Sequence, residues 1–324
     1  MPVNPLTLYW SSDFIHHEVS AGHPESANRL RSIRDLLGET GQWEAYQKVE
    51  ARAAALDEIA LIHPIEYIRR VEQTTQQGPT VVDSADTEVS TGSFLAARKV
   101  VGAGLQAADD VLSGRSRTAF ILGRPPGHHA LPSLAMGFCL FANVALAANY
   151  ARQTGRVERI AVIDWDVHHG NGTQDIFFST DRVYYISTHE FPLYPGTGRS
   201  DEKGIGTGRG YTLNFPLPAG KGDQDFLDIL EGPVTDALMA YKPELILISA
   251  GFDAHEYDPL GNMNITAEGF GLMTRVVKRL ADELCHGRII SFLEGGYHLD
   301  GLAESVSRHL AALAQEQPPE NINQ

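Results

Sequence analysis

Short runs of aliphatic and β-branched residues alternate along this chain with longer segments whose apolar residues recur at helical spacing. Such an alternation is typical of βαβ units, in which successive strands are parallel and helices connect them. The sequence therefore predicts an α/β fold built on a parallel sheet. The clearest predicted strands are residues 118–122, 160–163, 183–187, 245–249 and 289–293.

Four segments between these strands have a helical pattern. Residues 93–112 are rich in alanine and carry apolar residues at helical spacing. Residues 226–240 follow a start rich in aspartate, which favours a helix N-terminus because the helix dipole is positive there. Thr266 is a candidate N-cap for a helix that ends near residue 284, and another helix is predicted over residues 143–151.

Reactive side chains follow four of the predicted strands directly. In chain order they are His128 and His129; Asp164, Asp166, His168 and His169; Asp253; and Tyr297. In open parallel sheets, ligands bind beyond the carboxyl ends of the strands. The sequence therefore predicts a single site that four separate loops assemble at one edge of the sheet.

Three of these residues form a candidate metal site. Asp166 and His168 are two positions apart, so their side chains point the same way in extended chain, and Asp253 can join them from a neighbouring strand end. Two carboxylates and one imidazole leave coordination positions open, which is the pattern of a catalytic zinc ion. Manganese, iron or cobalt would also suit these ligands. The alternatives are that the aspartates are helix N-caps and the histidines are ordinary surface residues.

The histidine pair and the tyrosine have candidate roles beside a metal. Asp164 is the candidate partner of His128 and would raise its pKa. Asn171, a neutral partner, would leave His129 unprotonated near pH 7, as a general base requires. Tyr297 follows two glycines and could donate to an oxyanion; alone, it would be read as a half-buried core tyrosine.

Aromatic residues on two other loops are candidate walls for a substrate. Gly137 and Phe138 belong to the GFC segment, and Tyr194 belongs to FPLYPGTG. These residues could enclose a long, thin, apolar side chain next to the metal. Core packing is the competing interpretation for Phe138.

Composition and charge limit the classes of partner. The chain has 324 residues, 43% of them hydrophobic, and its net charge of −15 is spread along the sequence. A nucleic-acid surface needs a basic stripe, so we expect no nucleic-acid partner, whereas a cationic substrate is compatible with this charge. Without a repeat or a low-complexity linker, one folded domain is expected over residues 1–313, followed by a polar tail at 314–324 that frays.

The N-terminal segment and the cysteines indicate the compartment. The start, MPVNPLTLYWSSD, lacks the pattern of a signal peptide, and no run reaches the ~18 apolar residues that a membrane span needs. Cys139 and Cys285 lie among apolar residues outside any C-x-x-C motif, as reduced core cysteines do. We therefore expect a cytoplasmic protein without membrane contact, for which a homo-oligomer is compatible with the sequence.

A set of ordered motifs links the chain to a known family. The motifs are RPPGHH, GFCLFANVA, DWDVHHGNGTQ, ISTHE, YPGTG, ISAGFDAH and EGGY. Together they resemble the zinc-dependent histone deacetylase family, which also contains acetylpolyamine amidohydrolases. The resemblance extends from about His16 to His309. It implies a single arginase-like α/β domain with an eight-stranded parallel sheet flanked by helices, so the catalytic domain is expected over residues 1–313.

The resemblance also implies a role for individual residues. It makes Asp166, His168 and Asp253 the zinc ligands, His129 the base of the tandem pair, and Tyr297 the group that polarises the acetyl carbonyl. Arg29 would line an internal channel below the metal. A first potassium site would use Asp164, Asp166, His168, Ser187 and Thr188. A second potassium site would involve Phe177, Thr180, Val183 and Tyr211.

Other details bear on the substrate. GRPPGHH, GFDAHEYDPLG and Asn171 resemble the class II branch of the family. Leu260 stands where a polyamine-selective relative has a glutamate, which weakens the polyamine interpretation. The TEVSTGS segment has no clear match to the loop that grips the substrate backbone in relatives, and either Asp83 or Asp86 could serve there.

The sequence thus predicts hydrolysis of an acetyl or longer acyl amide on a lysine side chain, in a peptide or protein, or on a similar small amine. The products would be a carboxylate and a free amine. Three alternatives remain open. They are an acetylpolyamine amidohydrolase, a di-manganese ureohydrolase of the same fold, and a protein that binds acyl-lysine without hydrolysing it.

Overall fold

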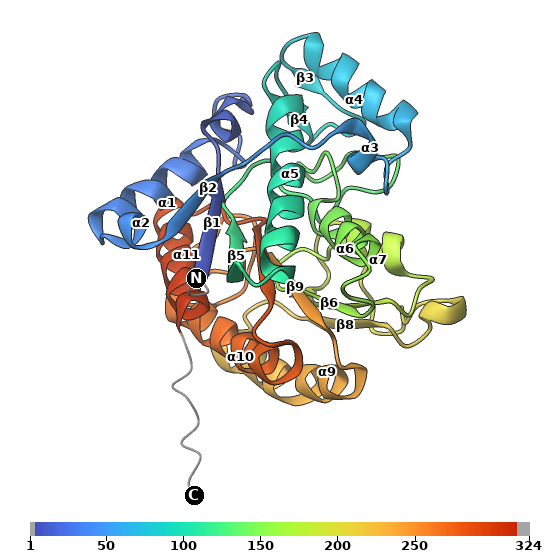
Figure 1. Ribbon diagram of the computed structural model, residues 1–324. Helices are drawn as coiled ribbons and strands as arrows, with labels where there is room; N and C mark the ends of the chain where they lie inside the picture. Colours follow the sequence, from blue (N-terminus) through green and yellow to red (C-terminus); the bar gives the residue numbers. More distant parts are fainter. Residues whose placement is uncertain (1–3, 316–324) are drawn as a thin grey trace, which may run out of the picture.

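A central sheet of eight parallel strands organises the computed structural model, which describes residues 4–315 (Figure 1). The order across the sheet is β2-β1-β5-β10-β9-β6-β7-β8. The strands are β1 (Asn4–Trp10), β2 (Gln47–Glu50), β5 (Ser116–Ile121), β6 (Ile160–Asp164), β7 (Val183–Glu190), β8 (Thr212–Leu217), β9 (Leu245–Ala250) and β10 (Ile289–Leu293). The predicted fold class, an α/β domain on an eight-stranded parallel sheet, is confirmed.

Helices cover both faces of this sheet (Figure 1). On one face, α5 (Ser93–Leu112) packs on β5 and β10, and α6 (Asn143–Gln153) packs on β9. On the other face, α11 (Leu299–Ala314) lies across β1 and β5 and contacts both α1 (Asn28–Glu39) and α10 (Ala267–Cys285). The other helices of residues 4–315 are α2 (Gln42–Ala45), α3 (Leu56–Ile59), α4 (Ile65–Gln76), α7 (Asn171–Phe177), α8 (Asp223–Ile229) and α9 (Thr235–Tyr241).

The remaining elements are short. A two-stranded antiparallel hairpin, β3 (Thr80–Val81) and β4 (Glu88–Val89), lies apart from the main sheet. Residues 4–315 also contain two 3₁₀ turns and one π-helical turn. They are η1 (Ser12–His16), η2 (Gly206–Gly208) and η3 (Leu230–Val234).

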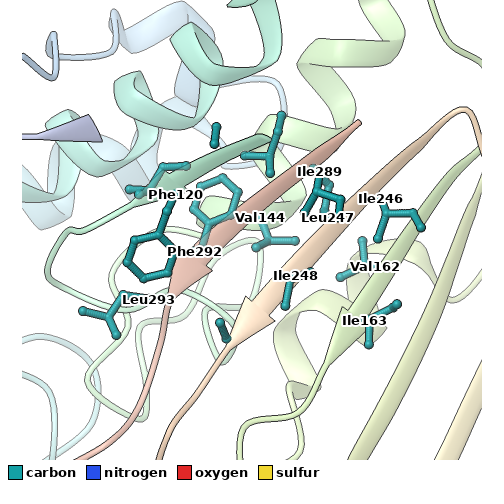
Figure 2. Close-up of a cluster of buried hydrophobic side chains, with 14 of the residues drawn as sticks. Phe120, Val144, Val162, Ile163, Ile246, Leu247, Ile248, Ile289, Phe292 and Leu293 are labelled. Carbon is teal, nitrogen blue, oxygen red and sulfur yellow. The ribbon is translucent and has the colours of Figure 1, made fainter. Parts of the chain in front are cut away.

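The middle strands are buried on both faces, which explains their near-continuous apolar sequences. Every residue of β6, β9 and β10 is buried. Figure 2 shows their side chains, with Val162, Ile248 and Phe292 on successive strands. The backbone of α5 comes so close to β10 that a Cβ atom at Gly104 would overlap the Phe292 ring. The helix and the strand are therefore in close contact at this point.

The five predicted strands agree with β5, β6, β7, β9 and β10 to within a few residues at each end. Thr266 is the N-cap of α10, as predicted, and its Oγ1 accepts a hydrogen bond from Gly269 N–H at 3.0 Å. The single helix predicted over residues 226–240 is wrong. It is interrupted by η3, where Gly232 leaves the helical region with φ −97° and ψ −106° and Pro233 has no N–H to donate.

In residues 4–315, no helix is both long and apolar enough to cross a membrane. Helix α11 ends at Ala314, and residues 316–324 of the predicted tail lie outside the described residues. The division into a catalytic domain and a frayed tail therefore stays a prediction.

Candidate metal centre and active site

Four neighbouring strands bring the reactive loops together. β5, β10, β9 and β6 are consecutive in the sheet and parallel, so their carboxyl ends meet at one edge. The residues that end or follow these strands are His128 and His129 (β5), Tyr297 (β10), Asp253 (β9), and Asp164, Asp166 and His168 (β6). His169 turns away, because its ring nitrogens contact Thr197 Oγ1 at 2.8 Å and Gln174 Oε1 at 3.0 Å.

Asp166, His168 and Asp253 form a compact group of ligand atoms. One ligand atom from each lies within 4.8 Å of the others, and all three residues are buried. The Nδ1 atom of His168 lies 3.1 Å from Asp166 Oδ1 and 3.1 Å from Asp253 Oδ2. Residues that are 85 positions apart in the chain therefore converge on one point.

The chemistry of this donor set fits a divalent metal ion. With a neutral imidazole the three groups carry a charge of −2, and burying such a charge without compensation is costly. Burial lowers the pKa of His168, but the carboxylates of Asp166 and Asp253 outweigh burial and raise this pKa to about 10. The group therefore favours a cation, and its two oxygens and one nitrogen match the ligands of catalytic zinc.

Two glycines let the backbone approach both acids. A Cβ atom at Gly251 would overlap Asp166 Oδ2, and one at Gly295 would overlap Asp253 Oδ2. The Gly295 N–H donates to Asp166 Oδ2 at 2.8 Å, and the Val167 N–H donates to Asp253 Oδ1 at 2.8 Å. Backbone groups thus fix the orientation of both carboxylates.

The two tandem histidines have opposite electrostatic surroundings. Burial lowers the pKa of His128, but Asp166 and Asp164 outweigh burial and raise it well above the ordinary value; Asp164 Oδ2 lies 3.2 Å from His128 Nδ1. Burial and the neighbouring His128 hold the pKa of His129 well below the ordinary value. His129 Nδ1 lies 2.8 Å from Asn171 Oδ1 and donates to it, which leaves Nε2 of a neutral ring as a proton acceptor.

Tyr297 reaches the site from the loop after β10. The Arg29 guanidinium lies 5.0 Å from the centroid of its ring, and Phe138 packs against it edge-on at 6.0 Å. Burial raises the pKa of the Tyr297 phenol well above the ordinary value, so the hydroxyl stays protonated and able to donate. Arg29 is itself fully buried and donates to Gly296 O at 2.6 Å and to Glu25 Oε1 at 3.0 Å. The channel predicted at Arg29 stays a prediction.

A pocket of about 270 Å³ reaches the candidate metal centre at His168. It is lined by Asp86, His129, Gly137, Phe138, His168, Leu193, Tyr194, Leu260 and Tyr297. Gly137 and Phe138 both have positive φ, 55° and 67°, and a Cβ atom at Gly137 would overlap the His129 ring. The left-handed turn therefore brings Phe138 into the wall, and all four predicted substrate contacts lie in this pocket.

Asp83 and Asp86, the two candidates for the loop that grips the substrate backbone, have different surroundings in the structure. Asp86 lines the pocket. Burial, together with the neighbouring Asp86 carboxylate, raises the pKa of Tyr194, so this phenol stays protonated. Asp83 forms an ion pair with Arg70 at 3.0 Å and accepts the Ala135 N–H at 2.9 Å, so it stabilises the β3–β4 turn instead. Asp86 is therefore the aspartate at the pocket.

Glu294 was not among the predicted site residues, although it begins the EGGY motif. Its Oε2 accepts the N–H groups of Gly127 at 2.7 Å and His128 at 3.2 Å, and Ser249 Oγ donates to its Oε1 at 3.3 Å. Burial raises the pKa of Glu294 to about 7. This carboxylate supports the backbone of the tandem histidines. Glu294 comes at the end of an apolar strand, as Asp164 does. This position was the signal in the sequence that could have identified Glu294 as a site residue.

The residues of the two predicted potassium sites lie in two adjacent regions. Asp164 and Ser187 are register partners on β6 and β7, and the other members of the first set, Asp166, His168 and Thr188, follow these positions closely. In the second set, Thr180 N–H donates to Phe177 O at 3.2 Å, Val183 begins β7, and Tyr211 O accepts from Tyr185 N–H at 3.0 Å. Potassium binding at either place stays a prediction.

At the carboxyl edge of its sheet, this α/β domain holds a buried acid–imidazole–acid group, tandem histidines and a phenol. This arrangement is the framework of a metal-dependent amidohydrolase. The sequence profile of the histone deacetylase domain matches residues 23–313. The chain is 40% identical to a probable deacetylase of Archaeoglobus fulgidus over 296 residues, which covers 91% of this chain and 82% of that protein. It therefore belongs to the histone deacetylase family.

Two further similarities agree with this membership. A histone deacetylase-like amidohydrolase of Pseudomonas aeruginosa is 38% identical, with 88% of this chain and 75% of that protein covered. The crystal structure of the HDA15 HD domain superimposes with a TM-score of 0.91 at 36% identity, covering 96% of this chain and 88% of that one. Family membership supports hydrolysis of the deacetylase type.

Proposed function

We propose that the protein is a zinc-dependent amidohydrolase that removes acetyl or longer acyl groups from lysine side chains or similar amines. The observation that carries this proposal is the convergence of Asp166, His168 and Asp253 beside a pocket that His168, His129 and Tyr297 line. The aromatic side chains of Phe138 and Tyr194 suit contact with an aliphatic chain. His129 and His168, which also line the pocket, supply the polar groups for hydrolysis.

A zinc ion held by Asp166, His168 and Asp253 would supply a Lewis acid that polarises the acyl carbonyl and favours deprotonation of the attacking water. His129 Nε2 accepts the proton of that water as its oxygen adds to the carbonyl carbon. Tyr297 donates a hydrogen bond to the carbonyl oxygen as negative charge develops there. His129 then gives the proton to the nitrogen, the C–N bond breaks, and the carboxylate and amine leave.

The roles of the supporting residues follow from their contacts. Asp164 accepts from His128 Nδ1 and keeps this ring cationic near the developing charge, whereas Asn171 fixes the tautomer of His129. The names of the relatives support deacetylation as the reaction class. We also assign two structural potassium ions to the sites predicted from the resemblance, with carbonyl oxygens as their main ligands.

The experiment that tests the function combines a substrate panel with metal removal. The purified protein is incubated with lysine peptides that carry acetyl or longer acyl groups and with N-acetylputrescine, before and after dialysis against a chelator. We expect amine release that the chelator abolishes and one equivalent of zinc per chain restores. Undiminished activity in metal-free protein would contradict the proposal, and two metal ions per chain would favour a ureohydrolase.

A polyamine substrate is the second candidate. It shares the chemistry but needs an acidic group that recognises a second ammonium, and the pocket lining contains Leu260 at the position in question and Asp86 as its one acid. A higher kcat/KM for N-acetylputrescine than for acetyl-lysine peptides would favour this candidate. Tight binding of acyl peptides without amine release would instead indicate a non-catalytic binding protein.

A further inference from the structure

Asp258 lies outside the metal centre and outside the pocket lining, yet its carboxylate binds the backbone of two residues that line the pocket, Leu260 and Tyr297. It is 7% exposed and forms no ion pair with any residue in the range 4–315. Its carboxylate accepts hydrogen bonds from three backbone N–H groups of two different loops. The donors are Leu260 (3.0 Å, to Oδ1), Tyr297 (2.6 Å, to Oδ2) and His298 (3.2 Å, to Oδ2).

The loop that carries Tyr297 needs such an anchor. Tyr297 follows two glycines, and Gly296 has a φ of +123°, a conformation that side-chain-bearing residues rarely adopt. Within the described part of the chain, the Tyr297 hydroxyl makes no hydrogen bond, so the ring is positioned by packing and by its own backbone. Two side chains bind that backbone directly: Asp258 accepts from the Tyr297 N–H, and Arg29 donates to the preceding carbonyl, Gly296 O.

The same carboxylate constrains the pocket wall. Leu260, whose N–H binds the other oxygen of Asp258, lines the pocket together with Tyr297. One buried side chain therefore sets the separation between the wall that contacts the substrate and the phenol that contacts the acyl oxygen. A rigid supporting contact of this kind matters because a displacement of about 1 Å can cost about a hundredfold in rate.

We propose that Asp258 is a positioning residue that acts through Tyr297, by holding the Tyr297 loop and the Leu260 loop in register. This inference rests on the proposed function, in which Tyr297 donates to the acyl oxygen. An amide cannot replace the carboxylate. The side chain of asparagine has a single acceptor oxygen, and its NH₂ group would face a backbone N–H instead of accepting from it.

The test compares Asp258→Asn with Glu256→Gln, a matched control. Glu256 is an exposed acid in the same loop, and its substitution removes the same charge. On an acetyl-lysine peptide we expect Asp258→Asn to lower kcat by about tenfold to a hundredfold with a smaller change in KM, and Glu256→Gln to stay within twofold of wild type. Zinc content per chain is measured for every variant and is expected to be unchanged.

A double variant separates positioning from general destabilisation. If Asp258 acts through Tyr297, Asp258→Asn combined with Tyr297→Phe is no slower than Tyr297→Phe alone. A double variant in which the two losses multiply would overturn the proposal, as would an Asp258→Asn enzyme as fast as the Glu256→Gln control. Asp258→Glu, which keeps the charge but moves the carboxylate by one methylene, replaces Asp258→Asn if the latter does not fold.

Hydrogen exchange tests the anchor without any substrate. In Asp258→Asn, peptides that contain the amides of Leu260, Tyr297 and His298 are expected to exchange at least about tenfold faster, and peptides around residues 126–132 are expected to keep the wild-type rate. Unchanged exchange at all three amides would refute the anchor. If the wild type hydrolyses no acylated amine, the proposed function fails on that result alone, while exchange still decides whether Asp258 holds the loop.

Discussion

At the scale of single residues, the two tandem histidines differ because their partners differ. Asp164 is an acid and Asn171 is its neutral counterpart, although both contact the Nδ1 atom of a histidine. The carboxylate favours a cationic ring, and the amide leaves the other ring neutral. The choice of one side-chain atom thus decides which histidine accepts a proton.

Asn171→Asp tests this assignment. A carboxylate 2.8 Å from His129 Nδ1 is expected to raise the pKa of His129, so that a larger fraction of the ring is protonated and inactive at neutral pH. The acidic limb of the kcat/KM profile then moves to higher pH, by about 1–3 units. The measurement is kcat/KM between pH 5 and 9 for both proteins. A profile that coincides with the wild type would show that His129 is not the base.

Tyr297→Phe removes the proposed hydrogen bond to the acyl oxygen and little else, because the hydroxyl has no partner among residues 4–315 and the ring contacts remain. We expect kcat to fall by about a hundredfold to a thousandfold, with bound zinc unchanged. Steady-state kinetics on an acetyl-lysine peptide, with metal analysis of the same sample, measures both quantities. A kcat equal to that of the wild type would exclude the role of Tyr297 as an oxyanion donor.

At the scale of elements, the site depends on how closely the loop after β10 approaches the loops after β6 and β9. Gly295→Ala would place a Cβ atom against carboxylate oxygens of both Asp253 and Asp166. One of the two acids must move, so we expect zinc affinity to fall sharply and activity to fall with it. Competition with a colorimetric chelator measures the affinity.

Gly38→Ala is the matched control for this substitution. Gly38 lies in α1, and a Cβ atom added there meets no other atom within 4 Å. Alanine in a helix is about 1 kcal/mol more favourable than glycine, so the control is expected to bind zinc normally and to be slightly more stable. Wild-type zinc affinity in Gly295→Ala would show that the close approach is not required.

Elements with a strong local pattern could be predicted from the sequence. β10 and α5 match their predicted bounds, since the first is a fully buried apolar run and the second has a clear helical period. β2 could not be recognised in this way, because it is an edge strand whose residues are mostly exposed and polar. Gly232 and Pro233 are residues that interrupt helices, but the aspartate-rich start before them favours a single continuous helix.

At the scale of the whole molecule, the candidate site was largely predictable because its residues mark strand ends. Asp166 and Asp253 follow β6 and β9, which are neighbours in the sheet, so residues far apart in the sequence lie close together. Residues that act on backbone atoms gave no comparable signal. Glu294 and Asp258 bind N–H groups of distant loops, and only the folded chain reveals those partners.

Global stability should depend on pH through a histidine remote from the site. His309 is fully buried between α10, α11 and β10; its Nδ1 lies 2.7 Å from Thr274 Oγ1 and its Nε2 lies 2.9 Å from Ser291 Oγ. Thr274 Oγ1 donates to Phe270 O at 2.7 Å, so it accepts from His309 Nδ1–H, and the neutral ring is fully satisfied. Burial lowers the pKa of His309 to about 3.

The sign of the pH effect follows from linkage. Between pH 6.5 and about 3, the unfolded chain binds a proton at His309 that the folded protein does not bind, so the free energy of unfolding decreases as pH falls through this range. Lowering the pH from 7.5 to 5.5 should cost about 1.4 kcal/mol through this one group.

His309→Gln removes the group that takes up the proton. Over the same pH interval, its free energy of unfolding is expected to fall by about 1.4 kcal/mol less than that of the wild type, as measured by denaturant titration. His16→Gln, at an exposed histidine, should follow the wild type, and equal losses in wild type and His309→Gln would show that His309 does not resist protonation in the folded state.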